Sequence, residues 1–490
     1  MRVLFVASEG LPFSKTGGLA DVVEALPKAL VQQGHEVAVL LPRYRGDKAA
    51  GVAIPSVTIP MGGTLRFPAI ADAGKPHGVQ YFFVDDPEYF DRENLYGTAA
   101  GDYPDNAERY AELCRAAIEL AKQLWMPDVF HCHDWQSALV PVLLRTSYAK
   151  DPALRNVPVV FTIHNMGYHG LFQPAAMEQV GLPSELFRMD KMEFFGGLNY
   201  LKGALLYSDY LTTVSPKYAQ EIQTPENGHA LDAVVRGRAD RLVGILNGVD
   251  YSVWSPENDP LIAAPYSAKD LSGKQACKRD LLAYFHMPEE NLGRPLLGMV
   301  SRFADQKGFD LVAEIVSQLL AENVALTVLG SGDARYEKMF VDLAARFPDR
   351  VGAKVGYDNA LAHKIEAGAD LFAMPSRYEP CGLNQIYSLR YGTVPVVRAT
   401  GGLDDTIEAF DGKTGSGTGF KFYQYTGAAL LATLREALAV FGDKTAWQRL
   451  QRNGIARDFS WDKSAAEYAK LYAVARGERT SANPNRVQNI

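Results

Sequence analysis

Short apolar runs alternate with helix-length segments through the first half of the chain. The first run occupies residues 2–7, and after a glycine-containing loop Leu19, Val22, Val23, Leu26 and Leu30 recur on one face of a helix. Further short apolar runs lie at residues 37–41, 79–84, 129–132, 158–163, 210–214 and 242–246. Strands that alternate with helices in this way predict a parallel sheet with helices on both faces.

The same alternation restarts after a break at residues 255–275. That stretch is rich in Pro, Ser and Asp and has no convincing period, so we interpret it as a linker or surface excursion. Apolar runs then recur at residues 296–300, 324–329, 351–355, 371–374 and 394–397, and an amphipathic helix is expected from residue 461 to about 475. The pattern predicts an α/β fold of two Rossmann-like domains, residues 1–255 and 256–460, then a helix at 461–478 and a frayed tail at 479–490.

Composition narrows the class of protein. The chain has 490 residues, of which 47% are hydrophobic and 22% charged, as is ordinary for a globular protein of about two to four domains. The 50 basic and 57 acidic residues give a formal charge of −7. No run of five or six Lys or Arg occurs, which argues against a nucleic-acid partner bound through its phosphates.

Cysteine usage and hydropathy indicate the compartment. Four scattered cysteines without a CxxC motif favour reduced thiols over a disulfide framework. The first apolar run is too short for a signal peptide, and no stretch approaches the ~18 consecutive apolar residues of a membrane span. We expect a cytoplasmic protein with no membrane partner.

Two similar loops recur in the two halves. Residues 16–21 read Thr-Gly-Gly-Leu-Ala-Asp and residues 400–405 read Thr-Gly-Gly-Leu-Asp-Asp, each just after a predicted strand and just before a predicted helix. Ligands of open α/β sheets bind beyond the carboxyl ends of the strands, so two facing domains would bring both loops to one interdomain cleft. The alternative is a Gly-Gly turn that simply starts a helix in each domain.

Candidate anion-binding groups lie in loops of both halves. Lys15 precedes Gly17 and Gly18 at the expected start of the first helix, where bare backbone N–H groups and the helix dipole favour an anion. Arg302 and Lys307 follow the first strand of the second half, and a guanidinium with an ammonium suits a pyrophosphate. A solvated loop is the alternative for that pair. Around a leaving diphosphate, these cations would replace a metal.

Polar side chains end two of the predicted strands. Strand alternation places His131 and His133 on one side and Cys132 on the other, and no nearby spacing supplies the further ligands of a zinc site. We therefore expect no metal. His164 ends the next strand at the carboxyl edge, where catalytic groups gather, although a lone histidine there is more often a structural hydrogen bonder.

The stretch from Met374 to Gln385 is the most informative. A strand ends, Glu379 follows in a tight turn, and a helix begins, so Glu379 is poised either to bind a polyhydroxyl ligand or to cap the helix. Cys381 has no histidine nearby in sequence to activate it and is interpreted as a small, half-buried residue. Among the aromatic residues between 81 and 103, Tyr96 lies in a loop and is the best candidate to contact a sugar.

Several of these motifs together resemble one enzyme family. The sequence is similar to the bacterial glycogen synthases and plant starch synthases in Lys15-Thr16-Gly17-Gly18-Leu19-Ala20-Asp21-Val22, His133-Asp134-Trp135, the loop 301–308, Glu379-Pro380-Cys381-Gly382-Leu383 and Thr400-Gly401-Gly402-Leu403. The match runs from residue 1 to about 475. It implies an ADP-glucose-dependent, retaining glycosyltransferase of the GT-B fold, with two facing domains, an interdomain cleft and a C-terminal helix that crosses back to the first domain.

The resemblance also implies roles for individual residues. Lys15, Gly17 and Gly18 would contact the diphosphate of the donor, and Arg302 and Lys307 would neutralise the leaving ADP. Asn247 and His164 would hold the donor glucose, and Glu379 would bind its hydroxyls. The remaining donor-binding positions would be Cys381, Gly382, Leu383, Thr400, Gly401 and Gly402.

On the acceptor side, Asp21 and Asp134 would position sugar or backbone in the cleft, and Tyr96 would lie towards the glucan. Tyr387 stands where many retaining GT-B enzymes have a second Glu, which is also the glycogen synthase pattern. The catalytic set implied by the family is Glu379, Arg302, Lys307, His164 and Lys15.

The implied activity is transfer of glucose from ADP-glucose to the non-reducing end of an α-1,4-glucan, with retention of configuration, release of ADP and no cofactor. No carboxylate is identified by sequence as a covalent nucleophile, so a front-face displacement is expected. One alternative is a related retaining GT-B enzyme that uses UDP-glucose or a small acceptor. Another is an inactive glucan-binding or regulatory protein, against which the intact Lys15, Arg302, Lys307 and Glu379 weigh.

Overall fold

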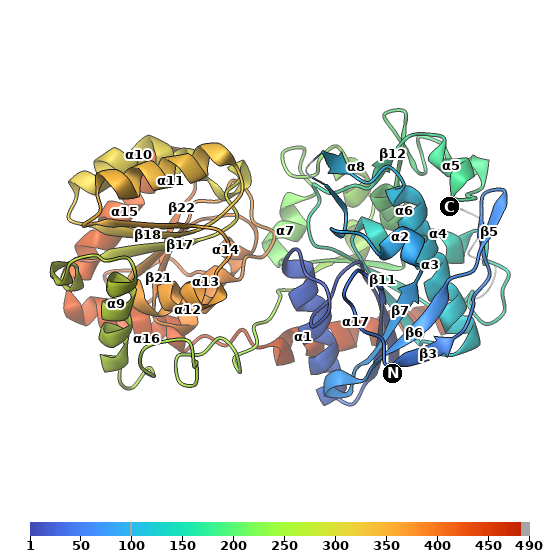
Figure 1. Cartoon of the computed structure of the whole chain (residues 1–490), viewed down its shortest axis with the longest axis horizontal. Coiled ribbons are helices and arrows are strands. Elements are labelled where there is room, and N and C mark those ends of the chain that lie inside the picture. The colour runs from blue at the N-terminus through green and yellow to red at the C-terminus, as the bar shows by residue number, and fades with distance from the viewer. Residues whose placement is uncertain (99, 482–490) are drawn as a thin grey trace. The chain divides into compact units, whose positions relative to one another are not determined.

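A computed structural model describes residues 1–98 and 100–481, and the chain forms two compact units (Figure 1). Of the described residues, unit 1 contains those of 1–214, 219–248 and 461–481, and unit 2 contains 215–218 and 249–460. The chain passes from unit 1 to unit 2 after Gly248, and the predicted boundary lies near residue 255. The predicted two-domain α/β fold is confirmed.

Unit 1 is built on a nine-stranded sheet with the order β16-β15-β11-β10-β1-β2-β7-β6-β3. All neighbours from β16 to β7 pair in parallel, whereas β6 and β3 are antiparallel additions. The strands of this sheet are β1 (Arg2–Val6), β2 (Glu36–Pro42), β3 (Gly51–Ile54), β6 (Ala69–Gly74), β7 (Gln80–Asp85), β10 (Val129–His133), β11 (Val159–Ile163), β15 (Tyr210–Thr213) and β16 (Leu242–Gly244). The predicted parallel strands are present, and the antiparallel edge was not predicted.

Smaller sheets decorate unit 1. They are formed by β4 (Ile59–Met61) and β5 (Thr64–Arg66), by β8 (Gly97–Thr98) and β9 (Gly101–Asp102), and by β12 (Leu171–Phe172), β14 (Gly197–Asn199) and β13 (Glu193–Phe194). The helices are α1 (Gly18–Gln32), α2 (Pro87–Phe90), α3 (Asn106–Gln123), α4 (Leu139–Arg145), α5 (Ala176–Gln179), α6 (Tyr200–Tyr207), α8 (Asp232–Arg236) and α17 (Trp461–Ser481). The residues of α7 (Pro216–Glu221) are divided between the two units.

The C-terminal helix α17 completes the core of unit 1. Buried residues recur along it at intervals of three and four, as the amphipathic pattern predicts, and Trp461, Tyr468 and Tyr472 join the cluster formed by β1, β2 and α1. The helix continues to Ser481, past the predicted end at 478, and residues 482–490 of the predicted frayed tail lie outside the described residues. Unit 1 is thus closed by the last helix of the chain.

Unit 2 is built on a six-stranded parallel sheet with the order β19-β18-β17-β20-β21-β22. Its strands are β17 (Leu296–Val300), β18 (Ala325–Gly330), β19 (Val351–Val355), β20 (Leu371–Met374), β21 (Val394–Arg398) and β22 (Phe420–Phe422). Its helices are α9 (Ser272–Tyr284), α10 (Phe309–Ala321), α11 (Ala334–Arg346), α12 (Asn359–Gly368), α13 (Asn384–Arg390), α14 (Gly401–Thr406), α15 (Gly427–Gly442) and α16 (Lys444–Ile455).

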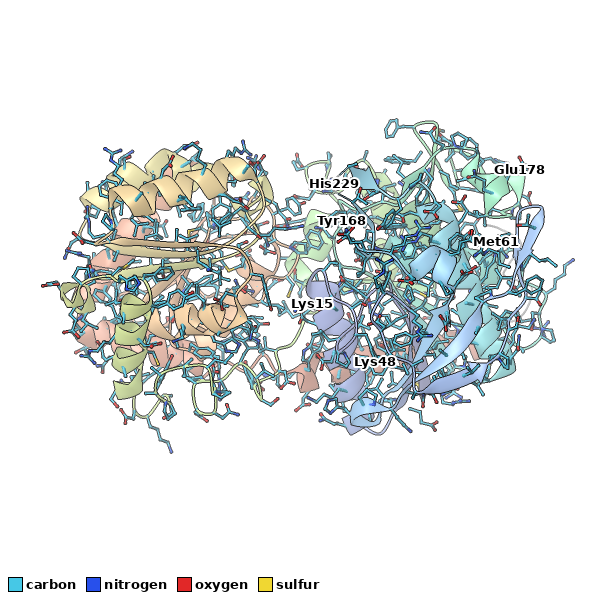
Figure 2. The ribbon with its side chains drawn as sticks, in the orientation of Figure 1. Lys15, Lys48, Met61, Tyr168, Glu178 and His229 are labelled. Atoms are coloured by element: carbon cyan, nitrogen blue, oxygen red, sulfur yellow. The ribbon has the colours of Figure 1, made fainter. Side chains whose placement is uncertain are left out.

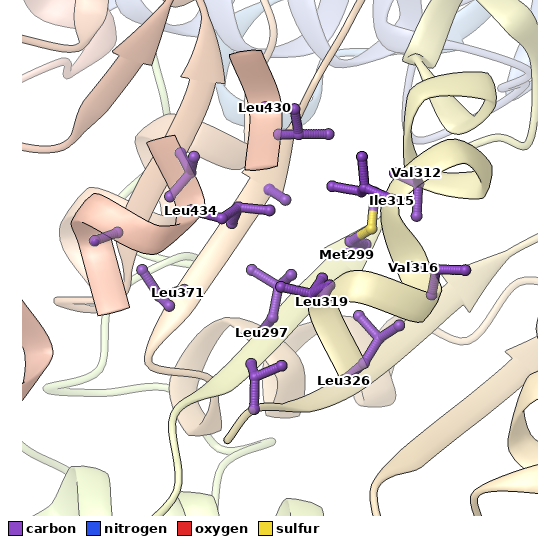
Figure 3. Packing of buried hydrophobic residues seen from close by; sticks show 14 of the residues in the cluster. Leu297, Met299, Val312, Ile315, Val316, Leu319, Leu326, Leu371, Leu430 and Leu434 are labelled. Atoms are coloured by element: carbon purple, nitrogen blue, oxygen red, sulfur yellow. The ribbon is translucent and has the colours of Figure 1, made fainter. Parts of the chain in front are cut away.

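Helices cover both faces of the unit 2 sheet, because its strands are apolar on both sides. Leu297 and Met299 of β17 face α10 and α15, where Ile315 and Leu434 pack against them (Figure 3). The alternate residue Leu296 packs with Leu281, Leu361 and their neighbours from α9 and α12 on the opposite face. The loops that follow these strands are therefore anchored to a sheet that is packed against helices on both faces.

Residues 255–271 differ from the predicted linker or surface excursion. The Asp259 carboxylate accepts hydrogen bonds from the Tyr391 hydroxyl at 2.5 Å and from Nδ1 of His363 at 2.7 Å. The Tyr266 hydroxyl donates to the Tyr391 carbonyl at 2.9 Å. The segment is fixed to unit 2 by these hydrogen bonds and by a small apolar cluster in which Tyr266, Ile262 and Leu271 take part. These apolar residues are irregularly spaced, which is why the segment shows no hydrophobic period.

In the part of the chain that the structure describes, every helix is too short or too polar to cross a lipid bilayer.

Candidate active site

Residues 7–17 connect β1 to α1 and contain the first predicted anion-binding group. The buried carboxylate of Glu9 accepts the backbone N–H of Thr16, and it accepts the Thr16 hydroxyl at 2.8 Å. Burial raises the pKa of Glu9, while the hydrogen bonds from Thr16 and Gly17 act in the opposite direction. The prediction of bare N–H groups at this helix start is therefore wrong for Thr16 and Gly17, whose N–H groups already bond to the Glu9 carboxylate.

Lys15 lies at the surface beside the start of α1 (Figure 2). Its Nζ donates to Oδ1 of Asp21 at 2.6 Å, so these two predicted site residues are brought together. A Cβ built on Gly18 would meet nothing within 4 Å, and one on Gly17 would meet only Oε1 of Glu9 at 3.7 Å. The space in front of the two glycines is open, which leaves room for a ligand to approach the backbone.

Tyr96 is half-buried rather than displayed by its loop. Its hydroxyl is 2.8 Å from Oγ of Ser8, and its ring centroid is 6.2 Å from that of Tyr110. Burial, followed by the nearby charge of Glu9, raises the pKa of Tyr96 well above its ordinary value. The tyrosine therefore contacts the loop that carries Lys15.

Asp134 joins the ends of two neighbouring strands. It has a positive φ of 54°, and its Oδ1 accepts the backbone N–H of His164 at 2.8 Å. Burial raises the pKa of Asp134 to about 7, hydrogen bonds from the backbones of His164 and Asn165 oppose the rise, and the charge of Glu9 adds to it. The carboxylate thus holds the turn after β11 and places His164.

Three histidines lie along β10 and just after β11, His131 and His133 fully buried and His164 half-buried. Nδ1 of His133 is 3.0 Å from Nε2 of His164. Nε2 of His131 is 2.7 Å from the Thr162 hydroxyl, and Nδ1 of His131 is 2.8 Å from the hydroxyl of Tyr472 in α17. Burial lowers the pKa of each histidine, to about 3 for His164, so all three rings are neutral near pH 7.

These side chains have not assembled into a metal centre. Among residues 1–98 and 100–481 no group of three or more His, Cys, Asp and Glu side chains is arranged to hold an ion.

Asn247 follows β16 and is 7% exposed. Its Oδ1 is buried without a hydrogen-bond partner among the described residues. An unpaired buried acceptor costs about 1–3 kcal/mol, which a ligand hydroxyl would recover. This geometry suits a residue that holds a sugar.

In unit 2, Glu379 is paired with a cation. Lys307 Nζ donates to Oε2 of Glu379 at 2.6 Å, and the Ser376 hydroxyl lies 3.1 Å from the same oxygen. The alternative that Glu379 caps a helix is wrong, because α13 begins at Asn384 after Leu383 and has no side-chain cap. Arg302 is exposed, and its guanidinium makes no hydrogen bond or ion pair within the described ranges.

The turn after β20 packs directly against the start of α14. The N–H of Gly402 lies 3.1 Å from the Glu379 carbonyl and 3.2 Å from that of Pro380. A Cβ on Gly401 would lie 1.9 Å from the Glu379 oxygen, and one on Gly402 would lie 2.0 Å from the Cys381 oxygen. Only glycine permits this approach, which brings residues 379–382 and 400–402 together.

The remaining predicted donor residues belong to the same contact. Cys381 is 5% exposed, more buried than the half-buried position predicted for it, and Thr400 is buried as well. Gly382 has a φ of +70°, and the Gln385 amide donates to the carbonyls of Cys381 and Gly382 at 3.0 Å. Leu383 immediately precedes α13.

The two Thr-Gly-Gly-Leu loops use their glycines differently. Thr400 lies two residues after the end of β21, whereas Lys15 lies well beyond the end of β1. Gly401 and Gly402 meet backbone oxygens, but Gly17 and Gly18 face open space. The prediction that each loop directly follows a strand is correct only for the second.

Comparison with known proteins identifies the family. Residues 2–237 match the model of the starch synthase catalytic domain, and residues 284–448 match that of glycosyl transferases group 1. A glycogen synthase of Koribacter versatilis is 58% identical over 481 residues, which cover 98% of this chain and 99% of that protein. The chain belongs to the glycogen synthase and starch synthase family. It is therefore a glycosyltransferase.

Other members of the glycogen and starch synthase family are similar over the same length. A glycogen synthase of Anaeromyxobacter dehalogenans is 50% identical, with 96% of this chain and 99% of the relative covered. The catalytic domain of starch synthase IV from Arabidopsis thaliana, solved bound to ADP and acarbose, matches with a TM-score of 0.88 and 34% identity over 97% of this chain and 99% of that one. Sucrose-phosphate synthase from Thermosynechococcus elongatus, with a TM-score of 0.60 and 18% identity over 96% and 98% of the two chains, shares the fold alone.

Sequence reasoning missed three side chains that shape this glycogen and starch synthase site. Glu9 occupies the Thr16 N–H, Ser376 contacts Glu379, and His133 contacts His164. The position of Glu9 was informative, because a carboxylate that follows an apolar strand can be buried only at a high free-energy cost unless it accepts hydrogen bonds. His133 and Ser376 stand in stretches that the sequence marks out, His133-Asp134-Trp135 and Met374 to Gln385, but their contacts with His164 and Glu379 were not predicted.

Proposed function

We propose that the protein transfers glucose from ADP-glucose to the non-reducing end of an α-1,4-glucan, retaining configuration and releasing ADP. The observation that carries the proposal is the Lys307–Glu379 pair, 2.6 Å apart beside a backbone contact that only glycines allow, in a chain of the glycogen and starch synthase family. The starch synthase IV structure that holds ADP and acarbose supports a nucleoside-diphosphate donor and a glucan-like acceptor.

Unit 2 supplies groups for the donor. Arg302 is an exposed guanidinium with no internal partner among the described residues, so it is available to bind a phosphate. Lys307 is held beside Glu379 and adds a second positive charge. The Glu379 carboxylate accepts hydroxyls of the glucose, and Cys381, Gly382, Leu383, Thr400, Gly401 and Gly402 form the surrounding backbone.

Unit 1 supplies groups for the sugar and for the acceptor. The unpaired Oδ1 of Asn247 accepts a sugar hydroxyl, and His164 contacts the same glucose. Lys15 and the backbone of Gly18 bind the diphosphate, and Gly17, whose N–H bonds to Glu9, leaves space for it by lacking a side chain. Asp21, Asp134 and Tyr96 serve indirectly, because Asp21 pairs with Lys15, Asp134 places His164, and Tyr96 supports the loop before α1.

The carboxylates of the predicted site are engaged, which favours a front-face displacement over a covalent intermediate. Asp21 is paired with Lys15, Asp134 accepts the His164 N–H, and Glu379 is paired with Lys307. In this mechanism the bond from the glucose C1 to the phosphate oxygen breaks, the bond from C1 to the acceptor oxygen forms on the same face, and the acceptor proton passes to the leaving phosphate.

The protein's own cations stabilise the negative charge that develops on that phosphate. A well-placed donor contributes about 3–4 kcal/mol to such a transition state. Lys15, Arg302 and Lys307 fill this role in the proposed reaction, which therefore needs no cofactor or metal. Turnover should accordingly be unchanged after dialysis against EDTA, and a loss that Mg²⁺ or Mn²⁺ restores would contradict this part of the proposal.

Incubation with labelled ADP-glucose or UDP-glucose and a maltooligosaccharide primer tests the whole proposal. We expect chain growth with ADP-glucose and an α-configured new linkage in the proton NMR spectrum. Glu379→Gln is the matched variant and should lose growth. Preference for UDP-glucose, transfer to a sugar phosphate in place of the primer, or absence of transfer with either donor would each contradict it.

A further inference from the structure

His133 lies between the core of unit 1 and His164, and the mechanism above gives it no role. Its side chain is fully buried, and its ring stacks on Phe5 with centroids 5.3 Å apart and an interplanar angle of 20°. Within the described residues the ring makes one hydrogen bond, from Nδ1 to Nε2 of His164 at 3.0 Å. Its other nitrogen, Nε2, is buried with no partner.

One of the two rings must donate in this hydrogen bond, since both are neutral. Burial lowers the pKa of His133 well below its ordinary value, with the neighbouring His131 and His164 adding to the effect, and burial alone lowers that of His164. If His164 donated from Nε2, the proton of His133 would sit on its own Nε2 and become a buried N–H without an acceptor. If His133 donates from Nδ1, its Nε2 is an unprotonated nitrogen against aromatic rings.

The second arrangement is favoured, because orphaned N–H groups in protein interiors are rarer than orphaned acceptors. It leaves His164 with an accepting Nε2 and a protonated Nδ1. No described residue hydrogen-bonds to that Nδ1, and the ring is only half-buried. The open nitrogen of His164 is then a donor.

We propose that His133 is a positioning residue that holds His164 in the Nδ1–H tautomer, so that His164 presents an N–H donor to its ligand. The identity of the ligand rests on the proposed glucosyl transfer. In that reaction the His164 N–H donates to a sugar oxygen, and the unpaired oxygen of Asn247 accepts a hydrogen bond from a sugar hydroxyl. The site would then offer the glucose hydroxyls both a hydrogen-bond donor and a hydrogen-bond acceptor.

Nuclear magnetic resonance of the full-length, ligand-free protein tests the tautomer directly. With ¹⁵N-labelled histidine, long-range proton–nitrogen correlations distinguish a protonated from an unprotonated ring nitrogen, and His164→Gln assigns the signals of residue 164 by their loss. We expect a protonated Nδ1 and an unprotonated Nε2 for His164. A protonated Nε2 would overturn the proposal.

The variant His133→Leu tests whether His133 causes the preference. We expect His164 to shift towards the Nε2–H tautomer that free neutral histidine prefers, and kcat/KM for ADP-glucose to fall by about tenfold. Thr212→Val is the matched control, since it removes a buried hydroxyl bonded to Thr162 at 2.5 Å without touching either ring, and it should leave the His164 signals unchanged.

Retention of the Nδ1–H tautomer in His133→Leu would show that His133 does not set it and would overturn the positioning role. Should that variant fail to fold, the spectrum of the unmodified protein still decides the tautomer. The spectra are recorded without substrate, so they test the tautomer of His164 whether or not the protein transfers glucose. The transfer assay tests the proposed function separately.

Discussion

Replacing Lys307 with Met separates the structural from the chemical role of the Lys307–Glu379 pair. The two charged atoms are 2.6 Å apart, and the side chains are 20% and 6% exposed. Met keeps the apolar stem and removes the charge, which leaves the buried Glu379 carboxylate beside the Ser376 hydroxyl with no cation paired to it in the described part of the chain. Removing one partner of a buried pair costs about 3–5 kcal/mol, and we expect the lower end because Lys307 retains some solvent contact.

The stability of unit 2 has to be measured separately, because a chain of two compact units need not unfold in one step. Amide hydrogen exchange in β20 and β21 reports on unit 2, and exchange in β1 and β10 serves as the internal reference. Lys307→Met should lower protection in unit 2 alone. The double variant Lys307→Met/Glu379→Gln should regain most of it, since no unpaired charge is left.

Turnover should behave differently from protection. Lys307→Met should lower kcat by a hundredfold or more, in line with about 3 kcal/mol for one transition-state donor, and the double variant should stay as slow. Lys278→Met is the matched control, because Lys278 and Asp370 form a similar buried pair at 2.6 Å that is not part of the site. It should lose protection and keep the kcat of the folded enzyme.

Two results would refute this reasoning. Near-wild-type turnover of Lys307→Met would remove Lys307 from the chemistry. Recovery of turnover together with protection in the double variant would show that the lysine acts only by balancing Glu379.

Three further outcomes are expected. Gly402→Ala should lower Tm strongly, because its Cβ would lie 2.0 Å from a carbonyl oxygen. Gly18→Ala, whose Cβ would meet nothing within 4 Å, should leave Tm nearly unchanged and raise the KM for the donor. Equal losses of Tm in the two variants would contradict this reasoning. Burial lowers the pKa of His164 to about 3 in the folded protein, whereas the unfolded chain binds this proton below pH ~6.5. The free energy of unfolding is therefore unaffected by this group above pH ~6.5, and it declines by about 1.4 kcal/mol per pH unit from there towards pH 3. His131 and His133 add slopes of the same sign, so urea unfolding of unit 1 in His164→Gln should show a slope smaller by about 1.4 kcal/mol per pH unit, and an unchanged slope would argue for a protonated His164 ring. Tyr472→Phe leaves Nδ1 of His131 unpaired and should cost about 1–3 kcal/mol, seen as faster amide exchange in α17; unchanged exchange would show that the bond is not needed.

The parallel strands could be predicted from sequence because they are apolar on both faces. Apolar runs such as residues 296–300 and 371–374 can be recognised as strands without knowing which strands lie beside them, and both are strands of unit 2. The antiparallel strands are less clearly marked: β3 has only three apolar residues, of which Val52 and Ala53 are exposed or half-buried, and Asp72 interrupts the apolar residues of β6. The packing of segment 255–271 was missed for a related reason, since it depends on a few irregularly spaced apolar residues and on hydrogen bonds to distant residues.

Part of the site could be predicted because parallel strands bring their ends to one edge. Lys307 and Glu379 lie 72 positions apart and follow neighbouring strands, β17 and β20, so their proximity follows from sheet order. The position of Glu9 against the Thr16 N–H depends on the path of an irregular loop, for which sequence gives no rule. The roles of the predicted residues in the reaction stay predictions until the variants are measured.

The placement of α17 in unit 1 constrains the order in which the protein is made. The hydroxyl of Tyr472 reaches the imidazole of His131 across 341 positions of sequence, and all of unit 2 is synthesised in between. At ~5–20 residues per second the ribosome needs roughly 17–70 seconds for that distance. During that time the sheet surface that Trp461, Tyr468 and Tyr472 later cover remains uncovered on the nascent chain. A chaperone that binds apolar surface would therefore have its clearest target on unit 1, although unit 1 is the first to emerge.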